Sequence, residues 1–181
     1  MFKKVTMLMV AALIVMSGCE VSGKEEVSGK EDDKGQAQPA IPPEISPYEP
    51  DIRAEDFVRE IDNPFMPLQV GSTWTYEGSS DGEEERGVVT VTSTTKKVMG
   101  VTCTVVKDEV FLEGEIAERT FDWFAQDRFG NVWYFGEAST DYENGRPVST
   151  KGSWEAGVDG ALPGIVMLAD PKVGIRYRQE Y

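Results

Sequence analysis

The sequence predicts a mainly β protein: an antiparallel meander that forms a curved sheet, a half-sandwich or an open barrel, behind a disordered N-terminal tether. After residue 63, short runs alternate apolar and polar side chains, as strands with one buried face do. A run rich in β-branched residues over 101–113 adds a longer strand. Turn-forming residues separate these runs, most clearly at Asn144-Gly145. Consecutive strands joined by tight turns pair as antiparallel neighbours, which produces the meander.

The first element of the domain is expected at residues 54–61, with the sequence AEDFVREI. Its apolar residues Phe57, Val58 and Ile61 recur at helical spacing. This spacing predicts one or two helical turns that dock against the N-terminal side of the sheet.

Two half-buried strands follow in the sequence. In residues 72–78, Trp74 and Tyr76 share one face and alternate with threonine and glutamate. Residues 87–94 alternate valine with threonine in the same way. The polar residues around Gly82 predict the turn between these strands.

The densest aromatic run lies on either side of a predicted turn at Asp127–Gly130. Before the turn, Trp123 and Phe124 fall on opposite faces of a strand, and after it Trp133 and Tyr134 do the same. Both faces of this hairpin are therefore apolar. The pattern fits a central hairpin covered on both sides, and it equally fits a hairpin that presents a binding face.

The C-terminal part is less regular in sequence. Residues 152–174 are rich in glycine and proline and predict a long loop or an irregular crossover. Residues 175–181, IRYRQEY, alternate again and predict a final strand.

The N-terminus has the three parts of a secretory signal, and we expect residues 1–18 to be a signal peptide. Lys3 and Lys4 form a basic start, and the apolar stretch at 5–16 is too short to span a membrane. Small residues then precede Cys19. The sequence Met-Ser-Gly-Cys resembles the lipobox of bacterial lipoproteins, with methionine in place of the commoner leucine.

This resemblance implies that Cys19 carries a diacylglyceryl group after the signal is cut and that its amine is acylated, for example with palmitate. Several acyl chains anchor a protein stably, whereas one chain does not. The alternative is an ordinary secretory signal cut near Ser17. The choice between the inner and the outer membrane stays open.

Residues 19–53 differ in composition from the rest and predict a disordered tether. They open with a duplicated EVSGKE at 20–25 and 26–31 and are acidic with few large apolar side chains. Such a segment cannot bury enough surface to offset its ordering entropy. We expect the β domain to occupy residues 54–181. The tether prolines are Pro39, Pro42, Pro43, Pro47 and Pro50.

Composition excludes several classes of function. The formal net charge of −14 disfavours nucleic acid as a partner. The chain has no histidine, so the commonest general base and zinc ligand are both missing. With two cysteines a cysteine-rich metal site cannot form. Cys103 alternates with valines and is expected to be an inert buried thiol. We expect no cofactor.

Several blocks of the chain are similar, in order, to an uncharacterised family of bacterial exported proteins, many of them apparent lipoproteins. The similarity covers about residues 55–181 and implies no activity, cofactor or catalytic residue. It also implies further strands after IRYRQEY, so that the chain is expected to be a C-terminally truncated copy. The blocks are NPFMPLQVGSTWTYEG, GVTCTVVKDEV, DWFAQDRFGNVWYFGE, GSWEAGVDGALPGIVM and DPKVGIRYRQEY.

Carboxylates near the aromatic run are the candidates for catalysis. Two of the three residues Asp122, Glu137 and Glu155 can be drawn as a pair across a sugar, as in glycosidases. Acidic residues are so frequent in this chain that such a pair arises by chance. We therefore predict that the protein is not an enzyme and has no catalytic residue.

Ligand binding has separate candidates. Trp133, Tyr134 and Trp154 are set among glycine-rich loops and form either a stacking platform for a sugar or part of the core. Asp141 and Glu143 supply clustered loop oxygens for calcium, but they fit no calcium-loop spacing, so no metal site is predicted.

The function we expect is that of a lipid-anchored protein of the bacterial cell envelope, on its periplasmic or cell-surface face. Its β domain is a non-catalytic module for binding or scaffolding. The expected partners are the membrane, through the N-terminal lipid, and an envelope protein or glycan. The alternative is a carbohydrate-binding module or carbohydrate-active enzyme that uses exposed tryptophans and carboxylates.

Overall fold

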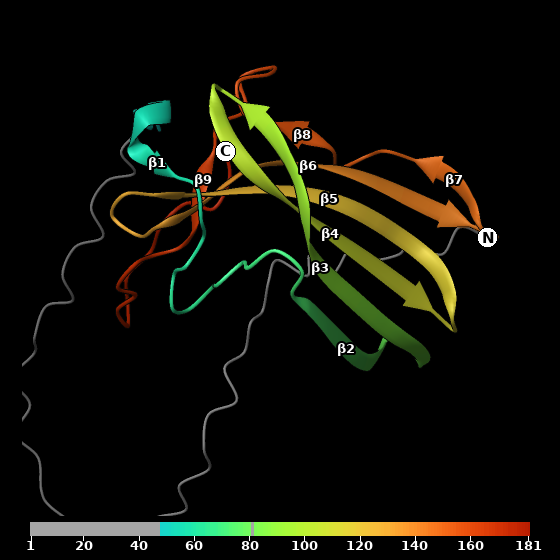
Figure 1. The fold of residues 1–181 in the computed structure, drawn as a ribbon. Coiled ribbons are helices and arrows are strands. Elements are labelled where there is room, and N and C mark those ends of the chain that lie inside the picture. The colour runs from blue at the N-terminus through green and yellow to red at the C-terminus, as the bar shows by residue number, and fades with distance from the viewer. Residues whose placement is uncertain (1–47, 81) are drawn as a thin grey trace, which may run out of the picture. The chain divides into compact units, whose positions relative to one another are not determined.

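The computed structural model describes residues 48–80 and 82–181. The predicted signal peptide, Cys19 and most of the predicted tether lie outside the described residues. Within those residues the fold is mainly β and has no α-helix, which confirms the predicted fold class. The sheet is antiparallel and strongly curved, and it stays open rather than closing into a barrel (Figure 1).

A single sheet contains all the described strands, in the order β2-β3-β4-β5-β6-β7. In addition, β1 pairs with β5, while β8 and β9 pair with β6. The outer side of β6 is thus covered by three short strands, β9, β8 and β7, one after the other. The elements are η1 (Ala54–Asp56, a 3-10 helix), β1 (Phe57–Val58), β2 (Thr73–Ser80), β3 (Glu83–Val98), β4 (Val101–Leu112), β5 (Glu115–Asp127), β6 (Val132–Glu143), β7 (Arg146–Ser149), β8 (Trp154–Glu155) and β9 (Gly164–Met167).

The predicted strands and turns of the meander are confirmed. Trp74 in β2 pairs with Val89 in β3, so the two predicted alternating runs share a face. Trp74 and Val89 are partly buried on that face, whereas Tyr76 is 40% exposed. At the β6–β7 turn, Asn144 and Gly145 have φ of +51° and +71°. Two left-handed residues in a two-residue turn match the twist of a hairpin, and asparagine and glycine tolerate that conformation best.

The predicted helix at 54–61 is wrong beyond its first turn. Only η1 is helical, and Phe57 and Val58 form β1 against the end of β5. Extended backbone there lets the Phe57 ring contact Phe135 edge-on, with ring centroids 5.4 Å apart. Burial of an aromatic ring therefore outweighs the weak local preference for a helix.

The predicted final strand at 175–181 is also wrong, although the irregular region before it is confirmed. Apart from the short β8 and β9, residues 152–174 have no regular structure, and after them a single bridge joins Glu180 to Pro163. A strand needs a partner along its length, and residues 173–177 are exposed instead. An alternating sequence shows that a segment is able to form a strand. It does not show that a neighbouring strand is present to pair with it.

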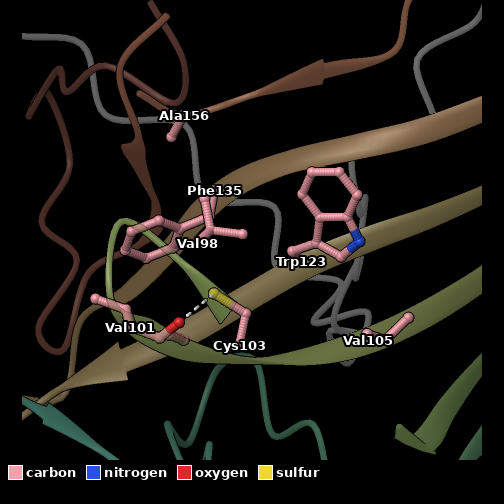
Figure 2. Close-up of a cluster of buried hydrophobic side chains, with 8 residues drawn as sticks. Val98, Val101, Cys103, Val105, Trp123, Phe135 and Ala156 are labelled. Carbon is pink, nitrogen blue, oxygen red and sulfur yellow. Dashed lines mark hydrogen bonds between the residues drawn. The ribbon is translucent and has the colours of Figure 1, made fainter. Parts of the chain in front are cut away.

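The main core lies on one face of the sheet, where the end of β3 and the beginning of β4 pack over β5 and β6. Phe135 and Cys103 are fully buried there, and Trp123 is 5% exposed. Figure 2 shows Phe135 and Val98 next to Cys103 and Val101. Partly buried Ile52, Phe57, Trp133 and Trp154 pack against this cluster. Its buried members are Val98, Val101, Cys103, Val105, Trp123, Ala125, Phe135 and Ala156.

A second apolar layer lies on the opposite face, under the loop at 59–72. Asn63 and Gln126 fasten this loop to the sheet: the Gln126 amide oxygen accepts the Asn63 backbone N–H at 2.8 Å. The Asn63 amide group donates to the carbonyl of Gly130 at 2.7 Å. The buried side chains of this layer are Ile61, Met66, Leu68, Val91, Val106, Phe124 and Val132.

A bulge in β6 changes which side chains share a face. Asp122 pairs with Glu137, and Phe124 pairs with Tyr134, so one residue of β5 lies opposite two residues of β6. The extra residue in β6 places Tyr134 and Glu137 on the same face, although residues three apart in a regular strand lie on opposite faces. Gly136, with φ of +129°, provides the conformation that the bulge needs.

Candidate functional site: two carboxyl groups around Tyr134

The Tyr134 hydroxyl lies between two carboxyl groups on the loop-covered face of the sheet. Its oxygen is 2.8 Å from Asp122 Oδ1 and 2.7 Å from Glu137 Oε2. Asp122 comes from β5 and Glu137 from β6, and the bulge brings all three side chains to one face. We call Asp122, Tyr134 and Glu137 the carboxylate cluster.

Aromatic rings hold Tyr134 in place. Phe124 stacks on it with ring centroids 4.9 Å apart, and Trp154 meets it edge-on at 5.3 Å. The Tyr134 residue is 6% exposed, while Trp154 is partly buried. Such packing fixes the hydroxyl at a position that both carboxyl groups can reach.

The burial of the cluster changes its acidity. Burial raises the pKa of Asp122 to about 8, against an opposing hydrogen bond from Tyr134. Burial also raises the pKa of Glu137, again opposed by Tyr134 and reinforced by the charge of Glu118. The pKa of Tyr134 is raised by burial and by both carboxylates, so its hydroxyl keeps its proton. A carboxylic acid that is neutral near pH 7 is a feature of proton-transfer sites and of buried structural clusters alike.

Further acidic groups extend from the cluster along the same face. Burial raises the pKa of Asp108 in β4 to about 6, and the charge of Glu118 adds to the shift. The Thr120 hydroxyl donates to Glu118 at 2.9 Å, and the Ser139 hydroxyl lies 3.3 Å from the same oxygen. This face is therefore rich in oxygen atoms that act as hydrogen-bond acceptors.

The structure brings together two of the three carboxylates considered from the sequence. Asp122 and Glu137 are in the cluster, but Glu155 is on the opposite face. Its carboxylate forms an ion pair with Lys96 at 2.8 Å, and Lys96 Nζ lies 3.5 Å from the centroid of the Trp123 ring. Glu155 therefore belongs to the main core side and has no part in the pair.

The three aromatic candidates do not form one platform. Tyr134 and Trp154 are in contact, whereas Trp133 is on the other side of β6, against Phe57. Trp133 Nε1 donates to Asp127 Oδ2 at 2.9 Å, so its polar atom is engaged within the domain. Ligand binding by these residues stays a prediction.

A surface depression of about 570 Å³ lies elsewhere, between residues 58–62 and 126–130. Charged groups line it, among them Arg59, Asp62 and Arg128, together with the exposed ring of Phe129. None of the three aromatic candidates lines this depression. The depression and the predicted aromatic platform are therefore at different positions.

The two calcium candidates lie on β6 near its end. Asp141 pairs with Glu118 and Ser149, and Glu143 pairs with Arg146 across the hairpin. In the described ranges 48–80 and 82–181, no three acidic, cysteine or histidine side chains are arranged to hold a metal ion.

Cys103 has the environment that the sequence predicts for an inert thiol. It is fully buried, and burial raises its pKa to about 12. A thiol that stays protonated is a poor nucleophile.

The predicted lipidation site Cys19 is not among the described residues. Over the part of the chain that is described, no helix combines the length and apolar character that crossing a bilayer requires. No protein-family model matched the chain, and neither the curated proteins nor the solved structures gave a match.

Sequence reasoning missed the role of Tyr134 as a bridge between carboxyl groups. It named all three residues of the cluster. However, it placed Tyr134 among the aromatic candidates for ligand binding and the two carboxylates among the candidates for catalysis. The signal that was present is the glycine within Tyr134-Phe-Gly-Glu137, because a glycine inside a strand marks a bulge.

Proposed function

We propose that this chain is a lipid-anchored protein of the bacterial cell envelope, on the periplasmic or cell-surface face, whose β domain is a non-catalytic module for binding or scaffolding. The observation that carries the proposal is the sequence Met16–Cys19 after a basic start and a short apolar stretch. An acidic, proline-rich segment then separates Cys19 from the compact unit that begins at Tyr48. That order supports Cys19 as the membrane anchor, the acidic segment as a spacer, and the β domain as the module for binding or scaffolding.

The side-chain contacts of the domain support the non-catalytic part of the proposal. The polar atoms of Trp133 and Tyr134 are engaged by Asp127 and by the carboxylate cluster. No buried side-chain nitrogen or oxygen in the described residues lacks a hydrogen-bond partner. Catalytic groups commonly keep a hydrogen-bond donor or acceptor free for a substrate. In a structural network, by contrast, every donor and acceptor is satisfied within the protein.

Cys19→Ala tests the anchor. We expect the variant to lose incorporation of a labelled fatty acid and to move from the membrane fraction to the soluble fraction, because the acylated atom is gone. Cys103→Ala is the matched control: it removes the other cysteine, which is buried, and should keep both the label and the membrane fraction. Unchanged processing and retention in Cys19→Ala would show that the N-terminus is an ordinary secretory signal.

The second candidate function is carbohydrate binding, and the contact between Trp154 and Tyr134 beside two carboxyl groups favours it. Tryptophan faces and carboxylates are the groups that commonly bind sugars. The test is a thermal melt of the full chain with a panel of envelope glycans. A glycan-induced rise in Tm that Trp154→Ala abolishes and Trp133→Ala retains would establish it. Melts that no glycan shifts leave the scaffolding proposal in place.

A further inference from the structure

The outer side of β2 carries backbone N–H and C=O groups that form no hydrogen bond within the described residues. β2 is at one edge of the sheet and pairs only with β3 (Figure 1). Two contacts show which residues face β3. The Val91 N–H donates to the carbonyl of Ser72, just before β2, at 3.0 Å, so Ser72 faces β3. At the other end, the Glu84 carbonyl accepts the Glu113 N–H at 2.9 Å, so Glu84 faces away from β2.

These two contacts determine the alternation along the strand. In an antiparallel pair, residues that face the partner strand alternate with residues that face away from it. Ser79 lies opposite Glu84 and therefore faces outward. Counting along the strand from Ser72 gives the same result. The residues of β2 that direct their N–H and C=O groups outward are Thr73, Thr75, Glu77 and Ser79, and all four are exposed.

A second copy of β2 fits this edge in one register. When the two strands run antiparallel with full overlap, a two-fold axis passes beside Tyr76. Thr75 then lies opposite Glu77 of the second copy, and Thr73 lies opposite Ser79 of the second copy. Every outward-facing residue meets another, and each such pair exchanges two hydrogen bonds. A shift of two residues loses one pair, and in one direction it sets the two Glu77 side chains opposite each other.

The charges of β2 are compatible with this register. Glu77 is the only charged side chain between residues 73 and 80, and in this register it lies opposite a threonine. Like charges directly opposite one another destabilise a strand pair, and this register has none. On its inner side, Glu77 has Arg86 of β3 as its cross-strand neighbour.

The aromatic face of β2 favours the same register. Trp74 lies opposite Gly78 of the second copy, and an aromatic side chain across from a glycine covers the backbone that the glycine leaves exposed. The strand itself does not require this glycine. Gly78 has no positive φ, and a Cβ there would meet nothing within 4 Å. In the paired arrangement, the Trp74 ring of the second copy covers this open space.

We propose that two copies of this chain pair through β2 in this register, so that their sheets join into one continuous sheet. A strand pair of this length buries less surface than the roughly 1,200–2,000 Å² of a stable interface, so the dimer is weak and reversible. The net charge of −14 on each copy weakens it further at low salt. The inference goes beyond the proposed function and uses only the β domain.

Disulfide formation tests the geometry in the full chain carrying Cys19→Ala, in which the buried Cys103 is the only native cysteine left. Tyr76→Cys places a thiol of each copy at the axis. The Cα atoms of such a non-hydrogen-bonded pair are about 4.5 Å apart, which is within disulfide range. We expect a covalent dimer under mild oxidation. Val148→Cys, at an exposed position of β7, is the control and should form at least about tenfold less.

Sedimentation in density-matched detergent tests the edge itself, again with the Cys19→Ala chain. We expect its mass to rise from monomer toward dimer as the protein concentration increases. Thr75→Pro removes one outward N–H and keeps the bonds to β3, because proline is tolerated on an edge strand where the N–H faces solvent. This variant should stay monomeric, with little change in Tm.

Two lysine variants test the register by sedimentation. Thr75→Lys sets a lysine opposite Glu77 of the second copy in two symmetric places, so the Kd of the dimer should fall about fivefold. Ser79→Lys is the matched control. It changes the net charge equally and is equally far from Glu77 along its own strand, but it lies opposite Thr73 of the second copy. Its Kd should change by less than about twofold.

Four results would overturn the proposal. The first is a chain that stays monomeric up to about 1 mM protein. The second is an equal yield of covalent dimer from Tyr76→Cys and Val148→Cys, which would indicate chance collision. The third is a folded Thr75→Pro variant that still dimerises, which would place the association on another surface. The fourth is an equal shift in Kd for Thr75→Lys and Ser79→Lys, and this comparison decides if Thr75→Pro does not fold.

Discussion

Asp127 organises the turn between β5 and β6 with a single carboxylate. One oxygen accepts the backbone N–H groups of Phe129 and Asn131, and the other accepts the Asn131 side chain and Trp133 Nε1, all at 2.9 Å. Asn131 in turn accepts the Ala169 N–H at 2.9 Å. One buried side chain therefore links the turn, the aromatic strand and the chain after β9.

Replacing Asp127 with alanine should leave several of these donors without a partner. We expect Asp127→Ala to lower the free energy of unfolding by about 3 kcal/mol, because hydrogen bonds to a charged acceptor are worth about 1.5–3 kcal/mol each and are not additive. Urea unfolding followed by tryptophan fluorescence measures this loss. Asp170→Ala, at an exposed carboxylate, should change stability by less than about 0.5 kcal/mol. A similar loss in both variants would contradict the assigned role of Asp127.

At the scale of elements, the bulge at Gly136 decides the arrangement of the carboxylate cluster. Besides its positive φ, Gly136 has no room for a side chain: a Cβ would lie 2.4 Å from the Trp154 carbonyl oxygen and 3.0 Å from the Trp123 ring. The bulge, the pairing of β8 and the position of Trp123 therefore depend on one another.

Gly136→Ala should be strongly destabilising. We expect a loss of about 2–5 kcal/mol in the free energy of unfolding, from backbone strain and the forced separation of β8 from β6. Gly78→Ala in β2 is the matched control, since its Cβ would meet nothing within 4 Å, and it should be nearly neutral. Equal effects at the two glycines would show that the bulge tolerates a side chain.

The strands and turns were predictable because their signals are local. The alternating pattern predicted β2 and β3, and Asn144-Gly145 predicted the last hairpin. Both signals depend only on residues that are neighbours in the sequence. The carboxylate cluster was not predictable in this way. Tyr134 and Glu137 are three residues apart, so regular alternation assigns them to opposite faces, and only the bulge reverses this assignment.

The two wrong elements have a related cause. Phe57, Val58 and Ile61 have helical spacing in the sequence, but Phe57 and Val58 are extended because the end of β5 is available as a neighbour. In residues 175–181, alternation was present but no strand edge lies beside most of them. In both cases long-range contacts determined the structure, and a local pattern carries no information about such contacts.

At the scale of the whole molecule, the raised pKa of Asp122 predicts how stability depends on pH. The folded protein keeps a proton that the unfolded chain loses near pH 4, so the free energy of unfolding falls as pH rises from about 4 to about 8. The slope from one such group is at most about 1.4 kcal/mol per pH unit. Above pH 8 this contribution no longer changes.

Urea unfolding at pH 6, 7 and 8 measures the slope where Asp108, with a pKa of about 6, contributes little. We expect the wild type to lose stability over this range and Asp122→Asn to lose much less. The opposite sign, with stability increasing from pH 6 to pH 8, would mean that Asp122 is ionised in the folded protein.

The two ends of the open sheet differ in their capacity to be extended. Among the described strands, β2 forms one edge of the sheet, and β7 shares the opposite edge with the short β8 and β9 (Figure 1). β7 has four residues, including Pro147, which lacks an N–H group, whereas β2 has eight residues and no proline. An incoming strand therefore finds a continuous row of donors and acceptors at β2 and an interrupted one at β7. We therefore expect any strand that is added to this sheet to pair with β2.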